Sequence, residues 1–330
     1  MSARFLTVFA ALVLGLSFSN GCASGPAQPF QVVAGNPTER LISAAAAGDQ
    51  STVDALLSKG LPVDSRNGDG LTALIAAASS SQDAIVTRLL AKGANPTLPK
   101  SDGWTPLLAA AQSGNVRSAR ALVEAGADAN GAGPEANTPL MAAARAGHLE
   151  MVEFLLDQSV SVDASARNGW TALQAAVQAK KLEIVAALLK GGADPNLAMA
   201  EGRTPLMAAA SSGQPDVVRE LLAGGANPNQ TDAQGWTAMM AASEAGNEEI
   251  VQDLIDAKAD IDMASDDGWT PLLIAADRGH SRLMRLLLEN GAKLETATST
   301  AVYADLNPRN TSSEPATASS PSHAPAPPPR

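Results

Sequence analysis

Apolar and polar positions along most of the chain follow the spacing of paired helices. One kind of segment places apolar residues three and four positions apart, as Val152, Leu155 and Leu156 do, which predicts a helix with one buried face. A second kind begins with Thr-Pro or Thr-Ala and runs into a cluster of alanines, such as the one at 109–111. Alanine lets neighbouring helices approach closely, so we expect an all-α chain built from helix pairs.

The helix pairs recur with a period of 33 residues, which a threonine marks seven times. Threonine is a good N-cap and proline fits the first helical turn, so each threonine is expected to start a helix. A fixed period of this length indicates a solenoid. The seven threonines are Thr72, Thr105, Thr138, Thr171, Thr204, Thr237 and Thr270.

Glycine recurs at two further positions of the 33-residue repeat. With the threonine position as the first phase, we call these the second and third phases. In the second phase, glycines such as Gly114 and Gly147 are expected to end the first helix of a pair in a left-handed conformation. In the third phase, glycines such as Gly126 close the second helix. Asp-Gly and Asn-Gly pairs just before the threonines predict turns. Four residues break these phases, and we interpret them as weaker joints between repeats: Ser81, Ser159, Lys180 and Lys258.

Repeat length, motif order and the seven threonine signatures together resemble the ankyrin repeat, a turn or finger followed by two antiparallel helices. The resemblance covers about residues 37–295 and implies a solenoid of eight helix-turn-helix units with short β-turn fingers. The first unit lacks the Thr-Pro start and is expected to be a cap, as terminal repeats of solenoids are. The family usually carries a bridging histidine after Thr-Pro-Leu, where this chain has mostly apolar residues, so we expect apolar packing there. Ala136 replaces the finger glycine, which predicts an irregular turn.

The first 21 residues have the layout of a secretory signal. A charged start with Arg4 precedes an apolar run of fourteen residues, which is shorter than the roughly 20 that a membrane-spanning helix needs. The only cysteine, Cys22, ends this segment in a sequence that resembles the lipobox of bacterial lipoproteins. We therefore expect a signal at 1–21 and lipidation of Cys22. Ordinary cleavage after Ala23 is the alternative.

Lipidation would tether the chain to the cell envelope, facing the periplasm, and Ala23 after the lipidated residue favours the outer membrane. Several acyl chains on one residue give a firm anchor. Without the lipid, the chain would be soluble in the periplasm or secreted. We expect residues 22–36 to be a flexible linker. Residues 296–330 are rich in Ser, Thr, Ala and Pro and are expected to be disordered.

The net charge and the sequence motifs narrow the classes of function expected for this chain. The net charge of −11 disfavours nucleic-acid binding, which needs a basic surface to neutralise phosphate. The three histidines, His148, His280 and His323, form no catalytic pattern, and the first two are expected to be structural. We find no metal, cofactor or nucleophile motif. We therefore expect a non-enzymatic protein without cofactors, and a monomer.

Tryptophan occurs four times, each time between the finger glycine and the threonine. In ankyrin repeats this position lies on the finger beside the concave surface used for partners. The row reads Leu71, Trp104, Asn137, Trp170, Arg203, Trp236 and Trp269. Each tryptophan either packs over its neighbour's finger or serves a partner as a hot spot, and both can hold. We expect the row to be densest where Trp236 and Trp269 follow each other.

These positions and the variable finger residues beside them give a candidate partner-binding surface. We predict a protein-binding scaffold of the bacterial cell envelope that recognises a protein through its concave face and fingers. An inhibitor or protector of an envelope enzyme, and a secreted effector that binds host proteins, are the alternatives. The candidate binding residues are Trp104, Trp170, Trp236, Trp269, Asp102, Asn168, Gln234 and Asp267.

Overall fold

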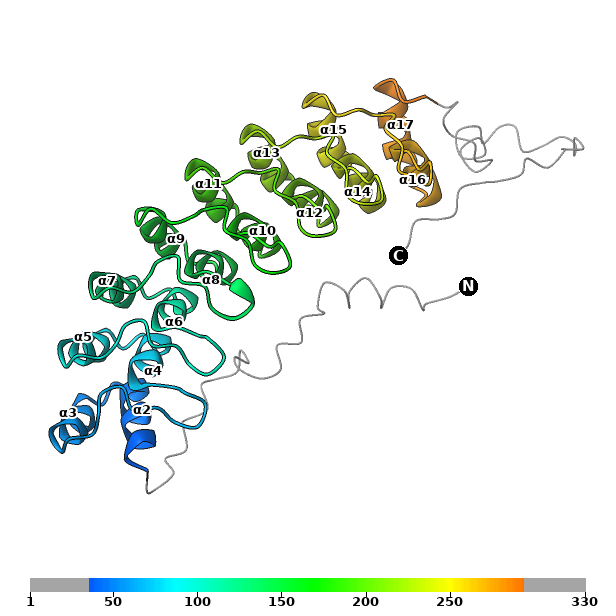
Figure 1. The fold of residues 1–330 in the computed structure, drawn as a ribbon. Coiled ribbons are helices and arrows are strands. Elements are labelled where there is room, and N and C mark those ends of the chain that lie inside the picture. The colour runs from blue at the N-terminus through cyan, green and yellow to red at the C-terminus, as the bar shows by residue number, and fades with distance from the viewer. Residues whose placement is uncertain (1–35, 294–330) are drawn as a thin grey trace, which may run out of the picture.

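A computed structural model describes residues 36–293, which form a curved stack of helix pairs (Figure 1). The predicted signal at 1–21, the linker up to residue 35 and the tail at 296–330 lie outside this range. Within it there are sixteen α-helices, a single 3-10 turn and no strand, so the all-α prediction is confirmed. None of these helices is long and apolar enough to cross a membrane.

The even-numbered helices line the inner side of the curve, and the loops that join successive pairs, here called the fingers, extend past them (Figure 1). These inner helices are α2 (Pro37–Ala47), α4 (Ala73–Ser79), α6 (Pro106–Ser113), α8 (Pro139–Ala146), α10 (Ala172–Gln178), α12 (Pro205–Ser211), α14 (Ala238–Ala245) and α16 (Pro271–Asp277).

The odd-numbered helices lie on the outer side of the curve, each antiparallel to the inner helix that it follows (Figure 1). These outer helices are α3 (Gln50–Ser58), α5 (Asp83–Ala91), α7 (Val116–Glu124), α9 (Leu149–Leu156), α11 (Leu182–Lys190), α13 (Pro215–Ala223), α15 (Glu248–Asp256) and α17 (Ser281–Glu289).

All seven periodic threonines cap an inner helix, as predicted. Each has an extended backbone and accepts a hydrogen bond on its hydroxyl oxygen from the backbone N–H three residues later, at 3.2 to 3.3 Å. The cap satisfies a donor that the first helical turn would otherwise leave unpaired. Every inner helix therefore starts at the same point of the repeat.

The turn between inner and outer helix is left-handed in each unit, as the second glycine phase predicts. Gly114 has φ 71°, and a Cβ there would lie 2.5 Å from Nδ1 of His148 in the next unit. The other ring nitrogen of His148 lies 3.1 Å from the carbonyl oxygen of Gln112. His280 lies 3.2 Å from the carbonyl of Glu244 in the same way. The two histidines thus join neighbouring units, which confirms the structural role predicted for them.

The four residues that interrupt the glycine phases keep the left-handed backbone. Ser81, Ser159, Lys180 and Lys258 have φ of 56°, 57°, 56° and 65°, a region that costs an L-residue roughly 1 kcal/mol or more. The rest of the unit holds each turn in its repeat geometry. That these joints are weaker than the others remains a prediction.

Alanine clusters and leucines fill the interface between units. The positions that follow Thr-Pro-Leu, from Ile75 to Leu273, are all buried, so apolar packing replaces the histidine bridge as expected. Gln174 is the exception, because its amide donates to the carbonyl of Leu197 at 2.9 Å and its oxygen accepts from Thr171 N–H. One side chain in this row therefore still ties an inner helix to a finger.

Candidate partner-binding surface

Each finger except the one at 127–137 is a tight turn that closes on a glycine. In the finger at 94–104, Gly103 N–H donates to the carbonyl of Lys100 at 2.9 Å, and Lys100 N–H donates to the carbonyl of Trp104 at 2.8 Å. Gly103 has φ 90°, a conformation that glycine adopts without steric cost. The residues before this glycine form the tip of the finger, and the tryptophan position follows it.

Side-chain oxygens near the base of the fingers hold successive units in register. An Asp or Asn accepts a hydrogen bond from a backbone N–H that lies 31 residues later, at 2.7 to 3.0 Å. Thr97 occupies this position in one finger and accepts no such bond among the described residues. The six acceptors are Asp64, Asn130, Asp163, Asn196, Asn229 and Asp262.

The tips of the fingers are also stacked by backbone hydrogen bonds. Ala233 N–H donates to the carbonyl of Glu201 at 3.1 Å, and Asp266 N–H donates to that of Gln234 at 3.1 Å. The equivalent donor in the finger at 127–137 is Pro134, which has no N–H. This finger contains the 3-10 turn Pro134–Ala136, with Glu135 at φ 55°, so the predicted irregular turn is confirmed.

The four tryptophans occupy equivalent places but differ in exposure. Trp104, Trp170 and Trp236 are half-buried against the core, whereas Trp269 is only 8% exposed and belongs to the core. Trp236 and Trp269 occupy adjacent fingers, where the row is densest, but Trp269 presents little surface to a partner. Within the described residues, no hydrogen bond is donated by the indole nitrogens of the three half-buried tryptophans.

The other candidate residues lie at the finger tips, and all four are exposed. Partial burial raises the pKa of Asp102, but hydrogen bonds from Lys100, 2.8 Å away, and from the backbone N–H of Trp104, together with the charge of Lys100, keep it below its ordinary value. Asp102 and Asn168 each accept a bond from the backbone N–H of the tryptophan two residues later, at 3.0 and 3.2 Å. Gln234 and Asp267 make no side-chain bond within 36–293. Whether these residues bind a partner remains a prediction.

Negative charge is concentrated in the fingers. The seven fingers, 61–71 and its equivalents through 259–269, hold 13 carboxylates and 4 basic side chains, a net charge of −9. The described range as a whole has 31 carboxylates and 20 basic residues, a net of −11, so everything outside the fingers carries −2. The sequence contains this concentration of charge, but it becomes visible only when the charges of the fingers are summed separately from those of the helices.

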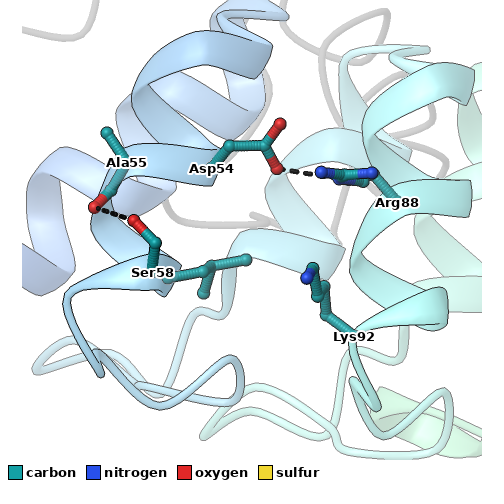
Figure 2. Close-up of a pocket in the computed structure, with 6 residues that line it drawn as sticks. Asp54, Ala55, Ser58, Arg88 and Lys92 are labelled. Atoms are coloured by element: carbon teal, nitrogen blue, oxygen red, sulfur yellow. Dashed lines mark hydrogen bonds and ion pairs between the residues drawn. The ribbon is translucent and has the colours of Figure 1, made fainter.

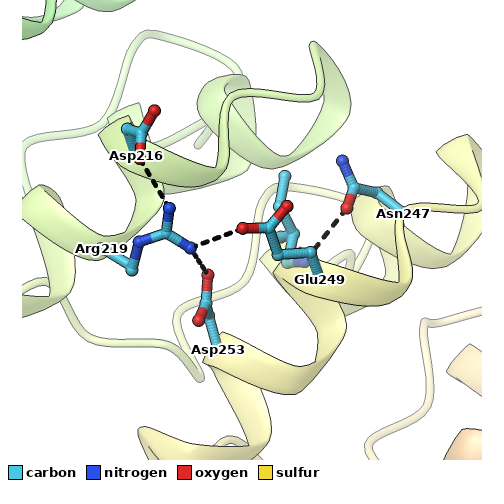
Figure 3. A network of polar contacts seen from close by, with 6 residues as sticks. Asp216, Arg219, Asn247, Glu249 and Asp253 are labelled. Carbon is cyan, nitrogen blue, oxygen red and sulfur yellow. Dashed lines mark hydrogen bonds and ion pairs between the residues drawn. The ribbon is translucent and has the colours of Figure 1, made fainter.

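On the outer helices, charges of both signs pair with one another. Arg219 of α13 contacts Asp216 on its own helix at 2.6 Å, and Glu249 and Asp253 of α15 at 2.9 and 3.0 Å (Figure 3). Hydrogen bonds to Glu249 and Asp216 raise the pKa of the arginine. The cluster joins two neighbouring outer helices through one shared arginine.

A shallow depression of about 330 Å³ between α3 and α5 is bridged by an ion pair of 2.8 Å between Arg88 and Asp54 (Figure 2). It lies on the outer helices, away from the tryptophans, and the hydroxyl of Ser58 in its wall donates to the carbonyl of Ala55 at 3.1 Å. The described residues contain no group of three or more His, Cys, Asp or Glu that could hold a metal ion.

Comparison with known proteins gives a family match and a structural neighbour. A family model described as ankyrin repeats in three copies matches residues 41–132, 129–199, 168–232, 191–264 and 206–298. Among solved structures, the human ASB11 ankyrin repeat domain aligns with a TM-score of 0.60 and 29% identity, covering 67% of this chain and 98% of that domain. No curated protein sequence matches the chain.

Proposed function

This chain belongs to the ankyrin repeat family, and on that basis we propose that it is a scaffold that binds a protein partner through its fingers and concave face. Ankyrin repeats generally mediate protein–protein binding, and the family is generally non-enzymatic. A partner-binding surface needs rigid side chains that are still accessible, because ordering flexible groups costs affinity.

The fixed backbone and partly exposed side chain of Trp236 are the observation that supports this proposal most. Its backbone N–H is held by Asp232 Oδ1 at 2.9 Å, and the finger around it is stacked on both neighbouring fingers. The indole nevertheless keeps part of its surface exposed. A large aromatic side chain on a fixed backbone is the kind of residue that dominates binding energy at protein interfaces.

A site-specific cross-link tests the binding surface. A photoreactive residue replaces Gln234 at a finger tip in one version of the full chain and Glu153 on outer helix α9 in the other; both positions are exposed. We expect a discrete protein adduct in the native cell only from position 234. Adducts of equal yield from both positions, or adducts from 153 alone, would refute binding through the fingers.

We further propose that Cys22 is lipidated and tethers the chain to the bacterial envelope, facing the periplasm, with the outer membrane favoured by Ala23. The sole cysteine at the end of a signal-like segment supports this. Cys22→Ser should move the chain from the detergent phase to the aqueous phase in a partitioning assay. If both versions partition into the aqueous phase, the chain is a soluble periplasmic or secreted protein instead.

A further inference from the structure

The carboxylates of the last three fingers fall into two groups. We call the fingers at 193–203, 226–236 and 259–269 the distal fingers; they hold seven carboxylates and one basic residue, Arg203. Four of the seven accept hydrogen bonds from backbone N–H groups and thereby shape the fingers. These four are Asp194, Asp232, Asp260 and Asp262.

The other three carboxylates, which we call the acidic strip, have no such role. Glu201, Asp266 and Asp267 are exposed, and none of them pairs with a basic side chain or accepts a hydrogen bond within residues 36–293. Arg203, the one cation of these fingers, lies 3.5 Å from the hydroxyl of Ser211. The charge of the acidic strip is therefore not neutralised by the described part of the molecule.

The same position in two earlier fingers has a cation nearby. Asp102 and Glu135 occupy the same position within the repeat as Glu201 and Asp267, since the four residues are separated by multiples of 33 positions. Asp102 pairs with Lys100 at 2.8 Å, and Glu135 lies 3.9 Å from Arg167. Asp69, at the same position of the first finger, is exposed and has no ion pair among the described residues, so an unpaired tip carboxylate is not unique to the distal fingers; the distal fingers differ in holding three of them beside a partly exposed tryptophan.

An aromatic side chain lies beside the acidic strip. Asp266 Oδ1 would be 2.9 Å from a Cβ on Gly235, which directly precedes Trp236. The indole of Trp236 is half-buried and its N–H donates to no described residue. The face of an indole attracts cations through its quadrupole, and tryptophan does so best among the aromatic residues. Carboxylates and an indole together suit a cationic side chain.

We infer that the distal fingers bind a segment of the protein partner that carries lysine or arginine side chains, with the cations held by Glu201, Asp266 and Asp267 and against the face of Trp236. Opposite charges on the two surfaces favour the encounter, and an acidic segment would be repelled. This inference rests on the proposed function and adds the chemistry of the partner to it.

A selection of displayed random peptides on the full chain tests the inference. The site variant is Glu201→Gln/Asp266→Asn/Asp267→Asn. A matched control, Glu153→Gln/Asp157→Asn/Glu289→Gln, removes the same charge from exposed positions of the outer-helix side that have no ion pair. We expect the selected peptides to be enriched in Lys and Arg and to lose about tenfold or more in affinity for the site variant, but not for the control. Binding should also weaken from ~50 to ~500 mM salt.

Four results would overturn the inference. Peptides that need Trp236 but show no enrichment in Lys and Arg would leave the fingers as a binding surface and remove the cationic partner. Peptides that ignore Trp236→Ala and the site variant alike would count against the proposed function as well. Equal losses in the site variant and the control would show that total charge, rather than the acidic strip, governs binding. Failure to select any peptide would also contradict the inference.

Discussion

The outer helices and the fingers belong to the same repeat, but their charged and aromatic side chains differ in ion pairing and exposure. On the outer helices, Arg219 forms ion pairs with three carboxylates from two units (Figure 3). In the distal fingers, Glu201, Asp266 and Asp267 form no ion pair with any residue of 36–293, and Trp236 keeps part of its indole exposed. The helices use their side chains to hold the stack together, whereas the fingers leave side chains available.

The first way to test this division is to damage the helical frame. Leu221 of α13 is fully buried, and Leu221→Ala should lower the free energy of unfolding by about 2 to 5 kcal/mol, because truncation removes apolar contacts and leaves a cavity. Denaturant unfolding of the full chain measures the effect. A loss below about 0.5 kcal/mol would show that the outer helices contribute little to the frame.

A smaller loss is expected when one cap is removed. Thr171→Ala deletes the hydroxyl that accepts from Gln174 N–H and should cost about 1 kcal/mol of stability. Thr171→Ser keeps the hydroxyl and is the matched control. If the serine and alanine variants unfold at the same denaturant concentration, the threonine row does not act through capping.

Removal of the outer ionic cluster should have a still smaller effect. Arg219→Gln breaks three ion pairs, but exposed pairs of this kind contribute little and are screened by salt. The shift in melting temperature should be smaller than that of Thr171→Ala and should vanish in high salt. A shift that persists in high salt would mean that the arginine stabilises the stack by packing.

The smallest expected effect is a dependence on pH at the N-terminal unit. Hydrogen bonds from Thr52 and Ser51 lower the pKa of Asp49 to about 2 from an ordinary value of 3.8. Because the folded-state pKa is the lower one, the carboxylate stabilises the fold above about pH 4, and this stabilisation is lost as the pH falls toward 2. Asp49→Asn should flatten the stability curve in that window. An unchanged curve would exclude the cap as its origin.

The sequence predicted the frame more completely than the surface. A period of 33 with Thr, Ala and Gly in fixed phases determines helix starts, close packing and turns, because each rests on local geometry. Lys180 shows how strong the repeat context is, since it keeps φ 56° at a glycine position. Predicting these features requires no knowledge of which units are in contact.

The features that the sequence did not reveal all depend on contacts between units. The burial of Trp269 at 8% exposure cannot be read from a motif that it shares with Trp236. The missing backbone hydrogen bond between finger tips at Pro134 and the unpaired state of Glu201 became apparent only once neighbouring fingers were placed side by side. Periodicity gives the position of a side chain within a unit, but its exposure depends on the units on either side.

The most direct test compares Trp236→Ala with Trp269→Ala, two changes of identical chemistry in adjacent fingers. The free energy of unfolding and the affinity for the protein cross-linked from position 234 are measured for both. We expect Trp236→Ala to weaken binding by about 2 kcal/mol with a smaller loss of stability, and Trp269→Ala to lose mainly stability because it is buried. Unchanged affinity in Trp236→Ala, with a loss of stability as large as in Trp269→Ala, would contradict a binding role for the fingers.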